Sequence, residues 1–269
     1  MLSERCSIIE RHPCLSKEAA HKYGRIHLPV APRCNIKCRY CLRRFDCANE
    51  SRPGRSSMVL RPEEAIERLR WYLERIEGLK VAAVAGPGEP LANQQTFNVM
   101  EMIRDEFPEL ILCLSTNGLL LTERMQDIID LGVGTLTVTL NAIDPEIGAK
   151  IYSYINYKGK TYIGAEAARI LLDNQLAGIE MAVKAGIVVK ANTIYMPEVN
   201  GDHLSDIAEY LKGLGIYLMN LMPLIPQSDF AALRPPTEVE LHQARERLKE
   251  IIPQMTHCRQ CRADACGKL

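Results

Sequence analysis

The sequence has no net charge and no long hydrophobic run, and each absence excludes a class of protein. Its 33 basic residues balance 33 acidic residues, so no general electrostatic field draws the chain to nucleic acid or to an anionic membrane. A tRNA-modifying role is therefore disfavoured. No apolar stretch reaches the length of a membrane helix, and residues 1–14 carry charged side chains where a signal peptide would have its apolar segment. We expect no nucleic-acid partner, no membrane partner and a cytoplasmic location.

The chain is rich in cysteine, with ten in all. Thiols stay reduced in the cytoplasm, so metal ligands are favoured over disulfides. Cys34, Cys38 and Cys41 form a C-x3-C-x2-C motif, with Tyr40 before the last cysteine. Three thiolates on one short loop can bind three irons of a [4Fe-4S] cube and leave the fourth iron open. The alternatives are a zinc site and a closed ferredoxin-like cluster with Cys47 as the fourth ligand.

The C-x3-C-x2-C motif resembles the signature of the radical SAM superfamily. In that superfamily S-adenosylmethionine (SAM) chelates the open iron, and an electron from the cluster then cleaves the sulfonium of SAM. A zinc pair would not need the three-residue gap, and Cys47 lies six residues beyond Cys41. The radical SAM interpretation is therefore favoured, and the resemblance implies a [4Fe-4S] cluster and SAM as cofactors.

Hydrophobic patterning alternates between short buried runs and helical stretches from residue 25 to residue 252. Strands are predicted at 25–32, 80–85, 110–115, 135–140, 187–194 and 216–221. Helices are predicted at 62–76, 94–106, 122–131, from 145, 164–185, 204–214 and 237–252. This alternation implies an α/β fold with a parallel sheet. Six units fall short of a closed eight-unit barrel, and a partial (β/α)6 TIM-like barrel is what the resemblance implies.

The predicted chain has three parts. An irregular N-terminal segment, residues 1–24, carries Cys14. The partial barrel follows at 25–222, and a C-terminal helix with a cysteine-rich tail occupies 223–269. We expect that tail to be poorly ordered unless something ties it down, and metal binding can provide that tie.

Small and polar residues follow the predicted strands, at the barrel edge where active sites lie. The run containing Gly86, Gly88 and Glu89 resembles the superfamily element whose backbone contacts the SAM amino group, and glycine permits such an approach. An ordinary tight turn is the alternative, and a dinucleotide fingerprint lacks its third glycine. The other SAM-pocket candidates, each of which could instead cap a turn, are Ser115, Asn117, Thr139, Asn141, Asn192 and Ile194.

A second set of metal ligands surrounds the first predicted strand. Cys14 and His27 flank that strand, and Cys113 lies in the third strand, where it could face the barrel interior. Two thiols and an imidazole could hold a second cluster. A lone strand cysteine is nevertheless more often a small core residue.

A third set lies in the tail, where Cys258 and Cys261 form a C-x2-C pair. The alternative metal for such a pair is zinc. If the tail folds over the barrel mouth, the pair could join Cys47 around one more cluster. Cys6 and Cys266 have no assignment, although Cys266 could compete with Cys261.

Longer segments around these motifs resemble the NifB family, the radical SAM maturases of the nitrogenase active-site cofactor. They are residues 27–54, 85–93, 115–118, 141–152 and 258–261. The family fuses two [4Fe-4S] clusters into an eight-iron, carbide-bearing precursor of the iron-molybdenum cofactor. The resemblance implies that one SAM methylates a cluster sulfide, and that a second is cleaved to a 5'-deoxyadenosyl radical that takes hydrogen from the methyl group.

Carried over residue by residue, the resemblance implies three [4Fe-4S] clusters. The SAM cluster would take Cys34, Cys38 and Cys41. One substrate cluster would take Cys14, His27 and Cys113, and the other would take Cys47, Cys258 and Cys261. Glu50 and Arg52, beside Cys47, become candidates for moving protons or steadying charge, with an exposed salt-bridged loop as the alternative.

The resemblance also implies partners. They are an iron-sulfur cluster donor, a reductant, and a separate carrier or scaffold protein, since many family members carry a carrier domain beyond the point where this chain stops. Two other functions compete. One is a radical SAM enzyme with an auxiliary C-terminal cluster, of the molybdenum-cofactor cyclase type. The other is a non-catalytic iron-sulfur scaffold.

Overall fold

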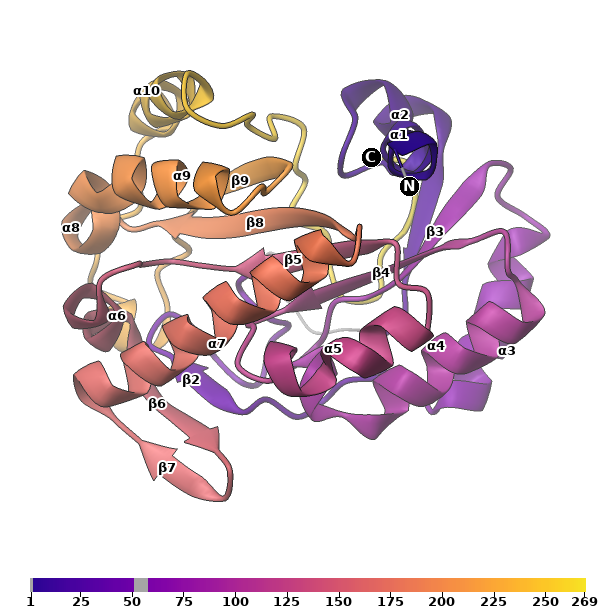
Figure 1. Cartoon of the computed structure of the whole chain (residues 1–269), viewed down its shortest axis with the longest axis horizontal. Helices are drawn as coiled ribbons and strands as arrows, with labels where there is room; N and C mark the ends of the chain where they lie inside the picture. The colour runs from indigo at the N-terminus through magenta and orange to yellow at the C-terminus, as the bar shows by residue number, and fades with distance from the viewer. Residues whose placement is uncertain (1, 51–57) are drawn as a thin grey trace.

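Parallel strands form the centre of the fold, in a computed structural model that describes residues 2–50 and 58–269. The strand order is β1-β3-β4-β5-β8-β9, and every neighbouring pair is parallel. The strands are β1 (Gly24–His27), β3 (Leu79–Val84), β4 (Ile111–Thr116), β5 (Thr135–Thr139), β8 (Val188–Tyr195) and β9 (Leu218–Pro223). The sheet curls as an open half-barrel (Figure 1). The predicted partial (β/α)6 barrel is confirmed.

Amphipathic helices join the strands. They are α3 (Pro62–Leu73), α4 (Gln94–Glu106), α5 (Leu121–Asp130), α7 (Gly164–Lys184) and α9 (Leu204–Gly213). Figure 1 shows α5 and α7 in front of the sheet. These two helices pack closely because Gly178 has no side chain: a Cβ there would lie 2.5 Å from Cγ of Leu121. No helix in the described part of the chain has both the length and the apolar character needed to cross a membrane.

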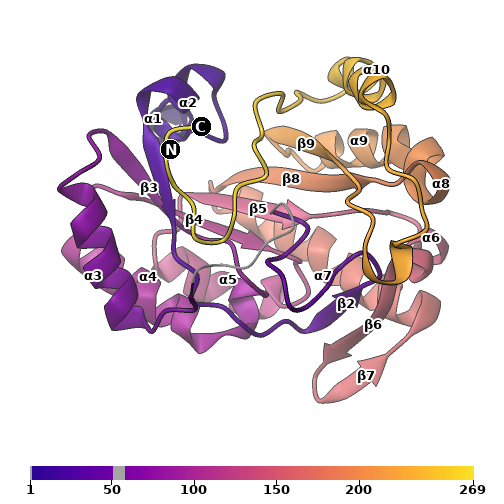
Figure 2. The ribbon, with the colours of Figure 1, turned by 180° about the vertical axis from the view of Figure 1, so that it is seen from behind.

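The face opposite α5 and α7 carries the cysteine loop and the C-terminal tail (Figure 2). The cysteine loop, residues 28–50, leaves the end of β1 and contains β2 (Ile36–Cys38). After β9 the chain forms α10 (Glu238–Lys249), and the tail then returns across this face toward the N-terminus. Residues from both ends of the chain therefore meet over the same side of the sheet.

Several elements differ from the sequence prediction. The N-terminal segment is not irregular, since it forms α1 (Leu2–Arg11) and α2 (Lys17–Lys22). The first strand is shorter than 25–32 and ends at His27. The helix that begins at Pro145, α6 (Pro145–Ile151), is followed by a hairpin that the sequence prediction missed. Its strands are β6 (Tyr152–Tyr157) and β7 (Lys160–Tyr162), and β6 pairs with β2. A short helix, α8 (Pro197–Asn200), follows β8.

The tail is held by backbone hydrogen bonds. Its last strand, β10 (Cys266–Gly267), pairs antiparallel with β1 at the edge of the sheet. The N–H of His27 donates to the carbonyl of Ala265 at 2.8 Å, and the N–H of Met255 donates to Met219 at 2.8 Å. The open edge of β1 thus offers the tail backbone partners that the sequence prediction, which considered only metal ligands, did not include.

Candidate active site and cluster sites

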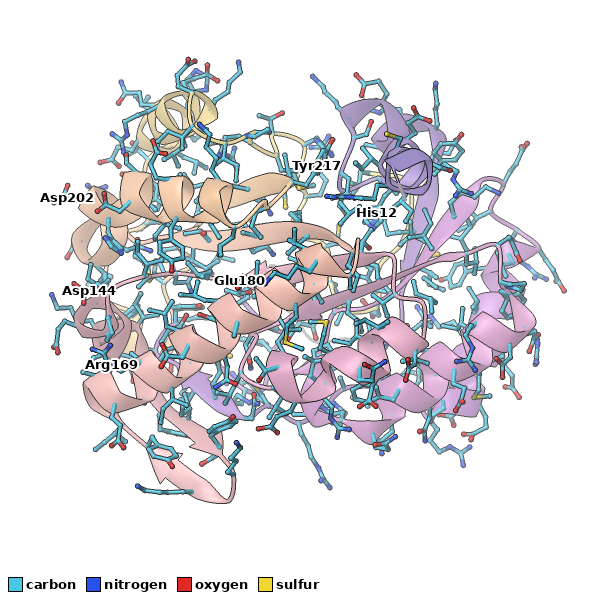
Figure 3. The ribbon with its side chains drawn as sticks, viewed as in Figure 1. His12, Asp144, Arg169, Glu180, Asp202 and Tyr217 are labelled. Atoms are coloured by element: carbon cyan, nitrogen blue, oxygen red, sulfur yellow. The ribbon has the colours of Figure 1, made fainter. Side chains whose placement is uncertain are left out.

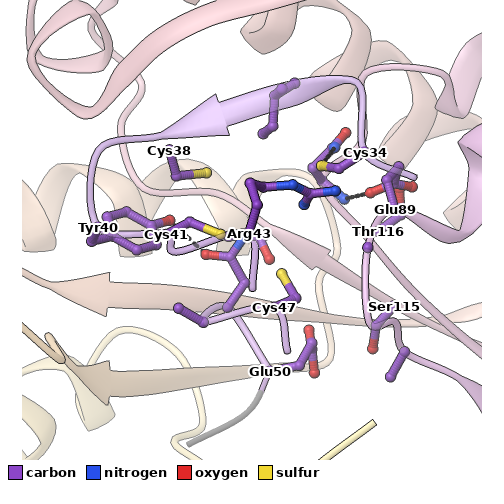
Figure 4. Close-up of a pocket in the computed structure, with 17 residues that line it drawn as sticks. Cys34, Cys38, Tyr40, Cys41, Arg43, Cys47, Glu50, Glu89, Ser115 and Thr116 are labelled. Atoms are coloured by element: carbon purple, nitrogen blue, oxygen red, sulfur yellow. Dashed lines mark hydrogen bonds between the residues drawn. The ribbon is translucent and has the colours of Figure 1, made fainter. Parts of the chain in front are cut away.

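The cysteine loop encloses a first cavity. Cys34, Cys38 and Cys41 line it together with Cys47, and the cavity measures ≈ 450 Å³ with its solvent-open part included. Pairing of β2 with β6 fixes the middle of the loop. A turn follows, in which the N–H of Cys41 donates to the carbonyl of Cys38 at 3.0 Å. Figure 4 shows the four thiols around the side chain of Arg43.

Burial keeps Cys34 and Cys38 as neutral thiols in the metal-free chain, because it raises the pKa of both. It raises the pKa of Cys34 to about 11, and the nearby carboxylate of Glu89 adds to the effect. Burial also raises the pKa of Cys38, where Cys41 and Cys34 further disfavour the thiolate. Thiolate is the form that binds iron, so cluster loading must displace these protons.

The arrangement of donors fits a cluster. Three thiols on one loop line a common space. Within residues 2–50 and 58–269, no three Cys, His, Asp or Glu side chains converge as ligands of a single metal ion would. A cubane takes each thiolate at a different iron, so its ligands surround a space and need not meet at one point. The cysteine loop is therefore suited to a [4Fe-4S] cluster.

Tyr40, within the cysteine loop, connects the loop to the sheet through hydrogen bonds. Its hydroxyl donates to Oδ1 of Asn49 at 2.5 Å and accepts from Nδ2 of Asn141 at 2.8 Å. Asn141 is 0% exposed, and its Oδ1 accepts from the N–H of Ile194 at 2.8 Å. These contacts join the loop to the ends of β5 and β8. Asn141 and Ile194, both predicted for the SAM pocket, line neither of the two cavities described in this section.

The glycine loop after β3 packs against the cysteine loop. A Cβ at Gly88 would lie 2.3 Å from the carbonyl oxygen of Arg33. The N–H of Gly88 donates to the carbonyl of Ala31 at 2.6 Å. The close approach that glycine permits here is thus to the segment that leads into Cys34. Gly88 also lines the first cavity, whereas Gly86 does not.

Glu89 ties the glycine loop to the end of β4. One carboxylate oxygen accepts from Oγ1 of Thr116 at 2.5 Å, and the other accepts from the N–H of Asn117 at 2.7 Å. Burial raises the pKa of Glu89 to about 7, while these donors act in the opposite direction. Three other predicted SAM-pocket residues line the first cavity beside Glu89: Ser115, Asn117 and Thr139.

A second cavity of ≈ 570 Å³ lies next to the first. Glu50, Ala85 and Ser115 line both cavities and so form their common wall. Asn192, predicted for the SAM pocket, lines only the second. The structure also gathers five predicted metal ligands around the second cavity: Cys14, His27, Cys113, Cys258 and Cys261.

The tail thiols in the second cavity accept hydrogen bonds. Nδ2 of Asn220 donates to Sγ of Cys258 at 3.4 Å. The guanidinium of Arg25 donates to Sγ of Cys261 at 2.6 Å. Both tail thiols are therefore held in place at the wall of the second cavity by side chains of the sheet.

Cys47 is not with the tail cysteines. It lies in the first cavity, and burial together with Cys41 and Cys34 raises its pKa. Its neighbour Asp46 nevertheless reaches the tail, because Oδ2 of Asp46 accepts from the N–H of Ala263 at 3.2 Å. The structure therefore brings together two of the three ligands predicted for this cluster.

Glu50 lies between the two cavities, and is not on an exposed salt-bridged loop. Nδ2 of Asn192 donates to its Oε1 at 2.8 Å. Burial raises the pKa of Glu50 to about 7, although Lys190, Ser115 and Asn192 favour the carboxylate. Arg52 lies outside the described residues.

Sequence reasoning missed several residues at these cavities. Arg43 lines the first cavity, and His12 and Lys190 line the second. Lys190 is 6% exposed and sits in the middle of β8. A charged residue inside a buried strand is rare, so it was a signal that the sequence did offer.

Comparison with known proteins identifies the family. Residues 28–211 match the radical SAM superfamily. The FeMo cofactor biosynthesis protein NifB of Methanocaldococcus jannaschii is 46% identical over 267 residues, which cover 99% of this chain and 89% of that protein. The chain belongs to the NifB family of radical SAM proteins.

NifB of Klebsiella pneumoniae is 44% identical over 265 residues, and these cover 96% of this chain but 57% of that protein. The chain thus spans little more than half of that relative. Among solved structures, methylornithine synthase (PylB) superposes with a TM-score of 0.59 at 16% identity, covering 94% of this chain and 68% of the other. That similarity shows a shared fold. Membership of the radical SAM superfamily implies one [4Fe-4S] cluster and SAM, which the cysteine loop fits.

Proposed function

We propose that this chain is a cofactor maturase of the lyase or transferase type that fuses two [4Fe-4S] substrate clusters. It inserts a SAM-derived carbide and so forms the eight-iron precursor of the nitrogenase iron-molybdenum cofactor. The observation that carries the proposal is the pair of adjoining cavities. One is lined by the radical SAM cysteines and the other by five further candidate ligands, with a common wall between them.

The chain's own residues hold and separate the reactants. Cys34, Cys38 and Cys41 hold the SAM cluster, which when bound supplies the electron that cleaves SAM. Cys14, His27 and Cys113 hold one substrate cluster. The common wall of Glu50, Ala85 and Ser115 keeps the two cavities adjacent, so a SAM held in one would lie close to a cluster held in the other.

Glu50 is the group we assign to proton removal. It lies in the common wall, and burial raises its pKa to about 7. A carboxylate with a pKa near the working pH can both accept a proton and release it again. Loss of protons from the methyl carbon is required if that carbon is to become carbide.

The second substrate cluster requires a rearrangement. Cys258 and Cys261 face the second cavity and Cys47 faces the first. Residues 42–50 must therefore shift toward the tail when a cluster binds to all three thiols. The contact of Asp46 with Ala263 provides a connection between the two segments.

The proposed setting is a reducing compartment, the cytoplasm. All ten cysteines are free thiols, as expected where thiols are kept reduced. A cluster donor and a reductant supply the reactants, and a carrier or scaffold protein of the nitrogenase pathway receives the product.

The position of Cys47 favours one competing arrangement, a closed cluster with four thiolates in the first cavity. Such a cluster could not bind SAM, and the protein would be an iron-sulfur scaffold. Adding SAM to the reduced protein distinguishes the two. Perturbation of the EPR spectrum and formation of 5'-deoxyadenosine support the open cluster, whereas an unchanged spectrum supports the closed one.

Metal content provides the main test of the proposed function. We expect anaerobically reconstituted protein to bind about twelve irons, four per cubane, with matching acid-labile sulfide. SAM carrying a labelled methyl carbon should then transfer that carbon into a product that activates cofactor-free nitrogenase. A plateau near four irons would exclude cluster fusion.

A further inference from the structure

The second cavity contains a histidine to which the proposed function assigns no role. His12 follows α1 (Figure 3), is 3% exposed and lines the cavity together with Cys14. Its Nδ1 accepts a hydrogen bond from the backbone N–H of Cys14 at 3.1 Å. A ring nitrogen that accepts an N–H carries no proton, so the proton of this neutral imidazole is on Nε2.

The Nε2–H of His12 has no acceptor among the described residues of the chain. Buried donors in folded proteins are almost always satisfied. This donor belongs to a ring that lines a cavity rich in thiols. It therefore points to a ligand of that cavity with an acceptor atom.

His27 lines the same cavity as the opposite tautomer. Its Nδ1 lies 3.0 Å from the carbonyl oxygen of Arg262. A carbonyl can only accept, so this Nδ1 carries the proton and Nε2 keeps its lone pair. Metal-binding histidines are oriented by such a hydrogen bond on the other ring nitrogen. The backbone thus makes His27 a ligand for iron and His12 a donor.

We propose that His12 is a positioning residue that donates its Nε2–H to a sulfide of the substrate cluster held by Cys14, His27 and Cys113. The inference depends on the proposed function, because it requires a cluster on those three ligands. Lys190 lines the same cavity and adds positive charge next to the anionic cluster. Hydrogen bonds to cluster sulfurs help set the reduction potential, because they stabilise the more negative reduced form.

Two substitutions separate the two hydrogen bonds of the His12 ring. His12→Asn keeps an oxygen that can accept the N–H two residues on, as in an Asx turn, but its shorter side chain places no donor at the former position of Nε2. His12→Gln places an amide N–H near the former position of Nε2 and so restores the donor. The pair keeps a polar side chain at residue 12 in both cases.

The measurement uses the full chain with Cys34, Cys38, Cys41, Cys258 and Cys261 all replaced by alanine. Only the Cys14, His27 and Cys113 site can then hold a cluster, with about four irons. Its midpoint potential is determined by a redox titration followed by EPR. Pulsed EPR on protein with ¹⁵N-histidine reports whether a ring nitrogen is bound to iron.

We expect His12→Asn to shift the equilibrium about tenfold toward the oxidised cluster, which is about 59 mV for one electron. His12→Gln should recover more than half of that shift. Loss of the cluster from His12→Asn alone would also support the donor role. The coupling to bound nitrogen should persist in both His12→Asn and His12→Gln. It should disappear only when His27 is replaced as well.

An unchanged midpoint potential in His12→Asn overturns this inference and leaves the proposed function standing. So does loss of the bound-nitrogen coupling in His12→Asn, since His12 would then be the iron ligand. Loss of the cluster from both variants, with the parent still loaded, overturns it too. Failure of the parent to bind four irons overturns the proposed function, and the inference with it.

Discussion

At the scale of residues, the three cysteines of the C-x3-C-x2-C motif carry the first prediction. Cys34→Ala, Cys38→Ala and Cys41→Ala should each abolish formation of 5'-deoxyadenosine, because two remaining thiolates cannot hold a cube with one open iron. The exposed Cys6 provides the control, and Cys6→Ala should retain activity. The assay measures 5'-deoxyadenosine from SAM under dithionite. Full yield from all three variants would show that SAM is cleaved elsewhere.

Glu50 carries a prediction about pH. Burial raises its pKa from 4.5 to about 7 in the folded state, so the folded protein binds this proton more tightly than the unfolded chain. The resulting stabilisation is complete below about pH 4.5 and is lost as the pH rises through 7. It amounts to at most about 3 kcal/mol.

Urea unfolding of the metal-free protein at pH 5 and pH 8 measures this effect. The free energy of unfolding should fall more steeply with pH in the wild type than in Glu50→Gln, which cannot titrate. Glu89 remains in both proteins and cancels from the comparison. Equal slopes would mean that Glu50 is ionised with an ordinary pKa in the fold.

Site residues could be predicted from the sequence where they lie so close along the chain that they must also be close in space. The motif Cys34, Cys38 and Cys41 is of that kind, and the structure has all three on one cavity. The donor role of His12 was not predictable, because it depends on which ring nitrogen meets the backbone of Cys14. That is a property of local conformation and not of spacing.

At the scale of elements, the contact between the glycine loop and the cysteine loop is the most sensitive to change. A Cβ at Gly88 would lie 2.3 Å from the carbonyl oxygen of Arg33. We expect Gly88→Ala to destabilise the protein by about 1–3 kcal/mol or more. It should also lower the iron content, because the displaced segment leads directly into Cys34.

Gly213 provides the matched control for Gly88. Nothing lies within 4 Å of a Cβ built there, and its φ is not positive. Gly213→Ala should therefore leave stability unchanged or slightly improved. Thermal unfolding and iron analysis of the two variants provide the comparison. Full iron content in Gly88→Ala would show that the cysteine loop tolerates the displacement.

The elements of the half-barrel were predictable because their signals are local. Period-2 and period-3.6 hydrophobic patterns predicted each of the six parallel strands and the helices between them. The hairpin β6–β7 also had a local signal, since Lys158 and Gly159 stand between the tyrosine-rich stretches 152–157 and 160–162, and a glycine there suits a tight turn. In the structure both residues have positive φ, at 48° and 76°. The helix predicted from Pro145 was given no end before residue 164, so this turn was not recognised. β10 has only two residues, and its pairing depends on the exposed edge of β1, which no local pattern reveals.

At the scale of the whole molecule, the arrangement of the cavities decides the chemistry. Residues from both ends of the chain meet there: Cys14 from the N-terminal segment and Cys258 from the tail line one cavity. Such a meeting is fixed by the topology of the sheet, so spacing could only suggest it. The resemblance grouped Cys47 with the tail cysteines, whereas the structure has it among Cys34, Cys38 and Cys41. The remaining question for the molecule is whether the tail cysteines hold a substrate cluster.

The double variant Cys258→Ser/Cys261→Ser addresses that question without removing the tail. The backbone pairing of β10 with β1 does not involve these side chains, so the tail should stay in place. We expect iron to fall from about twelve to about eight per chain. Formation of 5'-deoxyadenosine should persist, because the SAM cluster has its own ligands, while the eight-iron product should no longer form.

Cys266→Ser is the control for the double variant, since Cys266 lies on the same tail and pairs through its backbone with Ile26. It should keep about twelve irons and full product formation. The decisive assay adds each purified protein, with SAM and reductant, to cofactor-free nitrogenase. If the double variant still matured nitrogenase, the second substrate cluster could not depend on the tail. Cys47 would then be left as a neighbour of the SAM cluster, and the fusion would need ligands other than the six assigned to the substrate clusters.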